Sequence, residues 1–142
     1  WSRTQRYPSA SPQDDLPLQM LTTLLRIMGT ASGLAVFAVV LPYDWMNRGH
    51  IWLGLGTLPP VPIVGYLART LSAFYAFYGG LAWTLSFDTT RHRSIIQYVG
   101  LATLAFGGIL LAVDWTEGLP FYWRLLEGPV AIVYGALIIS FQ

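Results

Sequence analysis

An arginine and a glutamate in apolar surroundings are the charged residues best placed to do chemistry. Arg69 is the only charge in the apolar stretch 61–87, and Glu127 lies six residues into the apolar stretch 121–141. If both stretches enter a membrane from the same side, the two residues lie at depths that agree to roughly 3 Å, at about 1.5 Å per residue. An unpaired arginine inside the membrane costs at least about 2.5 kcal/mol. We therefore predict that Arg69 and Glu127 form an intramembrane ion pair.

The predicted pair has two interpretations. It can fix the register of two helices without binding anything, or it can line a polar pocket for a lipid headgroup, a carboxylate or a quinone oxygen. Tyr75 and Tyr78, six and nine residues after Arg69, would extend such a pocket along the same helix. We prefer the register role, because no further polar cluster accompanies the pair.

The other polar residues do not form a catalytic pattern. Asp114 and Glu117 are three residues apart, and we interpret them as turn and interface residues rather than as an acid–base pair or a cation site. The chain has no cysteine, and its two histidines, His50 and His92, lie in separate polar segments, which disfavours haem ligation. No phosphate-binding loop or nucleophile elbow is present. We therefore predict that the protein is not an enzyme and binds no cofactor or metal.

The composition predicts the elements that must position these residues. Of the 142 residues 54% are hydrophobic and 11% are charged, whereas soluble domains have about 25% charged residues. The net charge of +1 and the lack of a basic stripe argue against a nucleic-acid partner. We predict an all-α integral membrane protein, a four-helix transmembrane bundle. Its spans are residues 18–40, 61–87, 95–113 and 121–141, preceded by a polar arm, residues 1–17.

Residues 43–60 are too polar to cross. We predict a short amphipathic helix near residues 44–55, with Asp44 as its N-cap, lying at the membrane interface. Four tryptophans are expected to anchor the bundle at one interface: Trp45, Trp52, Trp115 and Trp123. Six glycines in the first three predicted spans are expected to let neighbouring helices pack closely: Gly29, Gly33, Gly79, Gly80, Gly107 and Gly108. Arg26, eight residues inside the first span, is expected to extend its side chain towards the interface.

The arginines predict the orientation. Arg3 and Arg6 in the arm and Arg91 and Arg93 between the second and third spans share one side, against Arg48 alone on the other. The positive-inside rule then places both termini in the cytoplasm, which fits a bacterial inner membrane.

The order of these features resembles a known group of proteins. A helix with G-x-x-x-G is followed by a proline, an aromatic loop, the stretch Y-L-A-R-T-L-S-A-F-Y-A-F-Y-G-G-L at residues 66–81, a glycine-rich helix, and a last helix with Glu127. This order is similar to that of bacterial four-helix membrane proteins of the DoxX-like kind. The resemblance implies a four-helix bundle with an arginine in the second helix and a glutamate in the fourth. Some such proteins are accessory subunits beside membrane oxidoreductases.

The predicted function is that of a small, non-catalytic integral membrane protein, an accessory or structural subunit of a larger membrane complex. The alternative is a lipid- or quinone-binding protein with its pocket at Arg69 and Glu127. The expected partners are membrane lipids and either another membrane protein or further copies of this chain.

Overall fold

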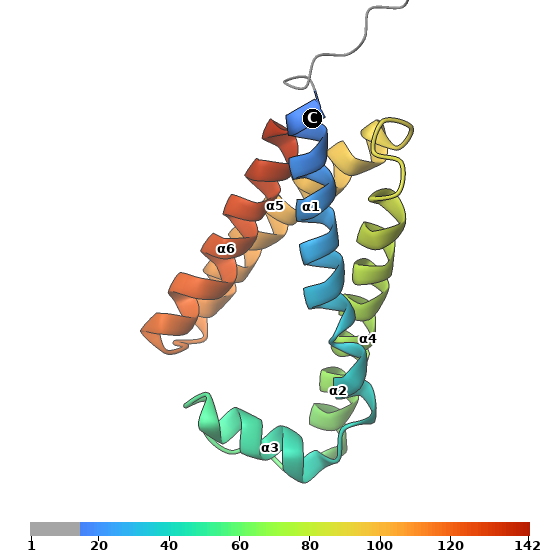
Figure 1. The fold of residues 1–142 in the computed structure, drawn as a ribbon. Helices are drawn as coiled ribbons and strands as arrows, with labels where there is room; N and C mark the ends of the chain where they lie inside the picture. The colour runs from blue at the N-terminus through green and yellow to red at the C-terminus, as the bar shows by residue number, and fades with distance from the viewer. Residues whose placement is uncertain (1–14) are drawn as a thin grey trace, which may run out of the picture.

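The computed structural model describes residues 15–142, and this part of the chain is helical, without strands (Figure 1). The helices are α1 (Asp15–Gly33), α2 (Val36–Val40), α3 (Tyr43–Trp52), α4 (Pro62–Leu85), α5 (Arg93–Thr116) and α6 (Phe121–Ser140). Most of the predicted arm lies outside the described residues. Residues 15–17, which we assigned to the arm, are instead the first residues of α1.

Three helical segments of the described chain are long and apolar enough to cross a membrane. They are Leu16–Val40, which joins α1 and α2 across a two-residue turn, Arg93–Thr116 and Phe121–Ser140. α4, the predicted second span, is 24 residues long but is not among the three. An all-helical fold with three candidate spans is therefore compatible with an integral membrane protein, and the fourth span stays a prediction.

The outer faces of the helices are covered by large apolar side chains. Val40 is 80% exposed, Phe74 68% and Phe77 79%. Such a surface is unfavourable in water and favourable in lipid, so it agrees with the membrane assignment.

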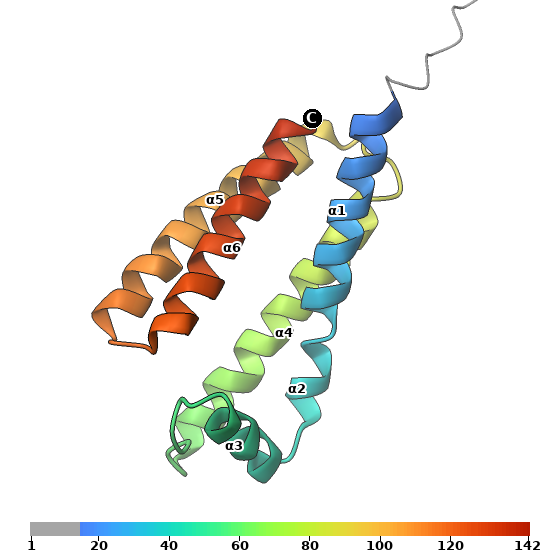
Figure 2. The same cartoon turned by 60° about the vertical axis from the view of Figure 1, so that its left-hand side comes forward.

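The helices form two antiparallel hairpins. In the first, α4 runs beside α1 and then α2, and in the second α5 runs beside α6 (Figure 2). Glycines bring the first hairpin together: a Cβ added at Gly79 would lie 2.7 Å from the carbonyl oxygen of Gly29 and 2.5 Å from the nitrogen of Gly33. The neighbouring Gly80 faces open space.

Four glycines at seven-residue spacing bring the second hairpin together, and we call them the glycine seam: Gly100 and Gly107 on α5, Gly128 and Gly135 on α6. A Cβ at Gly107 would lie 2.8 Å from the Gly128 oxygen, and one at Gly135 would lie 2.7 Å from the Gly100 oxygen. Gly108, which we predicted to pack, faces open space.

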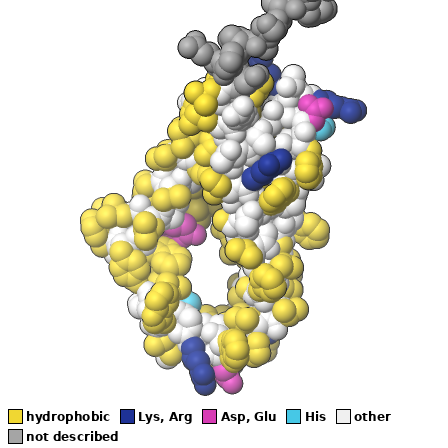
Figure 3. Space-filling view, viewed as in Figure 1, with side chains coloured by type: hydrophobic (Ala, Val, Ile, Leu, Met, Phe, Trp, Pro, Cys, Tyr) yellow, Lys and Arg dark blue, Asp and Glu magenta, His cyan; other side chains and the backbone are white. Residues whose placement is uncertain are grey.

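The two hairpins share one core, which lies at the end of the molecule near the C-terminus. Every long helix contributes to it: Leu21, Leu25 and Met28 from α1, Ala82 and Leu85 from α4, Ile96 and Val99 from α5, and Ile138 from α6. Away from this core the hairpins diverge, and the space-filling view shows an opening between them, which we call the central opening (Figure 3).

The short helix predicted near residues 44–55 is present as α3, but it begins one residue before Asp44, and its location at a membrane interface stays a prediction. Pro42 occupies the N-cap position, and Asp44 lies in the first turn without capping it. A carboxylate in the first turn still interacts favourably with the positive end of the helix dipole.

Candidate functional site: the central opening

Tyrosine hydroxyls connect the two hairpins at both ends of the central opening. At the core end, the Tyr134 hydroxyl in α6 donates a hydrogen bond to the Leu24 carbonyl and accepts one from the Met28 nitrogen at 3.2 Å. At the far end, the Tyr122 hydroxyl donates to the Leu53 carbonyl, at the C-terminus of α3. The Tyr78 hydroxyl of α4 also bonds the Thr103 hydroxyl of α5. The opening is thus bounded by helices and closed at each end.

Glu127 contributes a carboxylate to the α6 side of this region. Its Oε2 accepts a hydrogen bond from the Trp123 indole nitrogen at 2.5 Å, one turn earlier on the same helix. Glu127 is half-buried, and the Tyr75 hydroxyl on α4 lies within range of its electrostatic field. No hydrogen bond joins the Tyr75 and Glu127 side chains, and the pocket predicted around them stays a prediction.

Arg69 does not form the predicted ion pair with Glu127. Its Nε donates to the Val39 carbonyl at 3.0 Å, and its NH2 nitrogen donates to the Leu41 carbonyl at 3.1 Å. The last carbonyls of a helix have no partner within that helix, and Pro42, which follows, has no N–H to offer. The guanidinium thus caps the C-terminal end of α2, where the helix dipole also favours a positive charge. The arginine is satisfied by main-chain carbonyls instead of a carboxylate.

Asp114 is buried, whereas we predicted it at the turn surface. Its side chain is 2% exposed, and its Oδ2 has no hydrogen-bond partner in the described part of the chain. The signal was present in the sequence, because Asp114 continues the seven-residue spacing of Gly100 and Gly107. The antiparallel register of the glycine seam places it level with Phe121, at the start of α6.

Glu117, three residues later, is exposed, so the two carboxylates do not share an environment. Arg124, which could neutralise either carboxylate, is otherwise engaged: its Nε donates to the Leu119 carbonyl at 2.8 Å, and its guanidinium lies 5.0 Å from the centre of the Trp115 ring.

The predicted tryptophan anchors divide into two kinds. Trp45, Trp52 and Trp115 are 63%, 85% and 69% exposed, as side chains at a membrane interface would be. Trp123 is half-buried and is hydrogen-bonded to Glu127. Among residues 15–142, no three His, Cys, Asp or Glu side chains lie close enough together to hold a metal ion.

No protein-family model, no curated protein and no solved structure matches the chain.

Proposed function

We propose that the protein is a small, non-catalytic integral membrane protein that serves as an accessory subunit of a larger membrane complex. The observation that carries the proposal is the central opening, since the hairpins meet in one core at one end only. Empty space between helices forfeits dispersion contacts, so in a membrane the opening has to be filled by lipid or by an apolar segment of another chain.

We also propose that α4 is the fourth membrane-spanning helix. α4 lies antiparallel to α1 and α2 along their length and is bonded to the end of α2 through Arg69. A helix packed along a membrane-spanning segment crosses with it. We therefore propose a four-span arrangement with both termini in the cytoplasm, similar to that of the DoxX-like proteins.

The experiment is photocrosslinking in native membranes, with a photoreactive phenylalanine analogue at position 75, a half-buried position of α4. Position 77, where Phe77 is 79% exposed, is the matched control on the same helix. We expect a discrete protein adduct from position 75 and mainly lipid adducts from position 77. The mass of the gently solubilised assembly should exceed that of the single chain. A particle of one chain with lipid adducts from both positions would refute the accessory role.

A second function is favoured by the Glu127, Trp123 and Tyr75 side chains. Polar groups beside an apolar opening suit an amphipathic ligand such as a lipid or a quinone. In this case the purified particle would retain one such molecule per chain, and Glu127→Gln would reduce that retention while leaving the particle mass otherwise unchanged. Tyr66→Phe, an exposed tyrosine of α4, is the control.

A further inference from the structure

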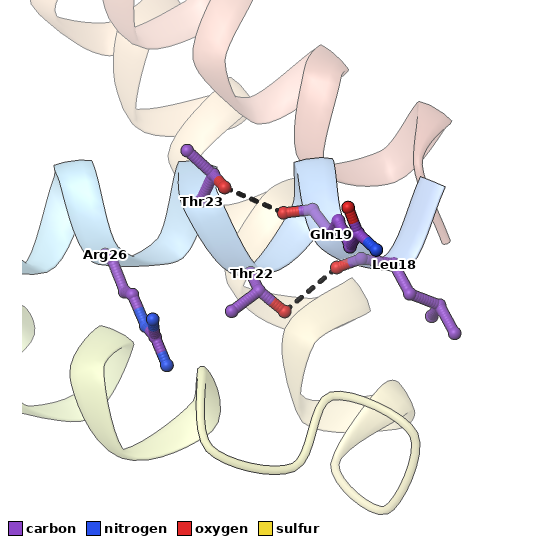
Figure 4. A pocket seen from close by; sticks show the side chains of 5 residues that line it. All are labelled: Leu18, Gln19, Thr22, Thr23 and Arg26. Carbon is purple, nitrogen blue, oxygen red and sulfur yellow. Dashed lines mark hydrogen bonds between the residues drawn. The ribbon is translucent and has the colours of Figure 1, made fainter. Parts of the chain in front are cut away.

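A polar groove runs along the outer face of α1, on a helix segment that is otherwise apolar enough to span a membrane. Leu18, Gln19, Thr22, Thr23 and Arg26 line its first part, a shallow hollow of about 450 Å³ (Figure 4). A second hollow shares Thr23 and Arg26 and continues the groove towards Leu34.

The threonines of the polar groove are already satisfied. Thr22, Thr23 and Thr30 each donate to the carbonyl four residues earlier, at 2.9, 2.8 and 2.8 Å. They place polar oxygen atoms along the groove without leaving a donor unpaired. Arg26 is the one charged residue that lines the two hollows.

Arg26 is exposed and is held in position by the first hairpin. Its guanidinium lies 5.7 Å from the centre of the Trp83 ring of α4, and its side chain makes no hydrogen bond to any residue between 16 and 142. Trp83 in turn occupies the space left by Gly29, where an added Cβ would lie 2.4 Å from its Cδ1 atom. The cation–π contact orients the charge but leaves the guanidinium donors free.

The depth of Arg26 indicates what it can bind. Its Cα follows Leu16, the first residue of the candidate span, by ten positions, or roughly 15 Å. Because helical side chains point back towards the N-terminus of the helix, the long arginine side chain brings the guanidinium closer to the headgroups than its Cα. Gln19 and Thr22 lie on the same face between Arg26 and the N-terminal end of α1. An anionic group can therefore approach along a polar path from that end, while the part beyond Arg26, lined by Ile27 and Leu34, is apolar.

We propose that the polar groove binds an anionic phospholipid from the leaflet at the N-terminal end of α1. The Arg26 guanidinium donates two hydrogen bonds to the lipid phosphate, a geometry that matches its planar fork. Gln19 contacts the headgroup, and an acyl chain lies along Ile27 and Leu34. A lipid fits better than a partner helix, because both hollows are shallow and are lined by α1 alone. Arg91 and Arg93, at the same end of the molecule, favour an anionic lipid over a zwitterionic one.

The test uses the purified full-length chain in nanodiscs of phosphatidylglycerol and phosphatidylcholine, 1:3, with retained lipids counted by native mass spectrometry. We expect the wild type to retain phosphatidylglycerol selectively. Arg26→Gln should lower that selectivity at least tenfold, and Arg48→Gln, an exposed arginine of α3 at the other end of the molecule, should change it less than twofold. Because no partner protein is present, this result is independent of the accessory-subunit proposal.

Equal selectivity in the wild type and Arg26→Gln would overturn the proposal. So would the loss of a co-purifying protein from native membranes on Arg26→Gln without any change in lipid retention, because the groove would then bind a partner helix. If Arg26→Gln does not fold, Arg26→Lys keeps the charge but not the two-donor fork. We then expect Arg26→Lys to show a selectivity between those of the wild type and of a chain without the charge. Wild-type selectivity in both single variants, Arg26→Lys and Trp83→Leu, would contradict the assigned geometry.

Discussion

Arg69 shows how a charge inside a helical hairpin can be accommodated by the main chain alone. A charge is expensive in an apolar environment until hydrogen bonds satisfy it, and the two carbonyls at the end of α2 provide those bonds. The sequence shows the charge of Arg69 and its depth. It does not show that α2 ends, with exposed carbonyls, beside the same turn of α4, because that depends on how the two helices pack.

The first prediction is that Arg69 and Glu127 contribute independently to the free energy of unfolding. Arg69→Gln should lower the free energy of unfolding by about 2–4 kcal/mol, because two hydrogen bonds from a charged group are lost. Glu127→Gln should cost less than about 1 kcal/mol, and the double variant should equal the sum within about 0.5 kcal/mol. The measurement is reversible unfolding in mixed micelles.

Arg48→Gln, on the exposed face of α3, is the control for the loss of an arginine. A coupling energy of about 3 kcal/mol or more between positions 69 and 127 would contradict the structure, because a buried ion pair couples its partners that strongly.

The second prediction concerns Asp114. A buried carboxylate oxygen without a partner is destabilising, and the uncharged amide of Asn has nearly the same shape. Asp114→Asn should therefore raise the free energy of unfolding by about 1 kcal/mol, measured by thermal unfolding in detergent. Glu117→Asn, at the exposed end of the same helix, should have little effect. If Asp114→Asn instead lowers the free energy of unfolding, the N-terminal end of α6, which lies level with Asp114, stabilises the charge of the carboxylate.

At the scale of helices, the glycine seam determines how closely α5 and α6 approach. Gly107 and Gly108 are adjacent in sequence, yet only Gly107 faces α6. The sequence predicts the Gly-Gly pair as a packing element but does not show which residue of the pair is in the interface. In the structure Gly107 lies opposite Gly128, and Gly100 lies opposite Gly135. The seven-residue spacing of the two glycines on α6 therefore matches the spacing from Gly100 to Gly107, and not that from Gly100 to Gly108.

The third prediction compares these two neighbours. Gly107→Ala should cost about 1–3 kcal/mol, because the added methyl would lie 2.7 Å from the Ile132 nitrogen and the helices would have to separate. Gly108→Ala should be neutral or should stabilise the protein by up to about 1 kcal/mol, because alanine favours the helix. Unfolding of both variants in the same detergent provides the measurement. Equal effects at the two positions would contradict the assigned register.

At the scale of the whole molecule, the hairpins are attached through one core and a few tyrosine hydroxyls. The core at the C-terminal end includes residues of every long helix, whereas Tyr122 provides a single hydroxyl contact at the far end. Composition and hydropathy correctly predicted an all-helical fold with membrane-like segments. They did not predict that the hairpins diverge, because lipid-facing and opening-facing positions are equally apolar in sequence.

The fourth prediction is that Tyr134 limits this divergence. Tyr134→Phe removes the bonds to Leu24 and Met28, worth about 1 kcal/mol, so the population of more widely separated hairpins should rise about fivefold. Spin labels at the exposed positions 63 on α4 and 126 on α6 would report it as a broader distance distribution. Tyr98→Phe, where the side chain is 71% exposed, should leave the distribution unchanged. An unchanged distribution for Tyr134→Phe would show that the core alone holds the hairpins.

The capping of α2 by Arg69 also has a consequence for biosynthesis. The carbonyls of Val39 and Leu41 precede Arg69 in the chain by about thirty residues, so they leave the ribosome well before the side chain that satisfies them. Until α4 arrives, the end of α2 must keep those carbonyls hydrated or bonded to the insertion machinery. In the proposed four-span arrangement, the first hairpin would complete its insertion as a pair of helices, in which the second helix supplies the hydrogen-bond donors for the exposed end of the first.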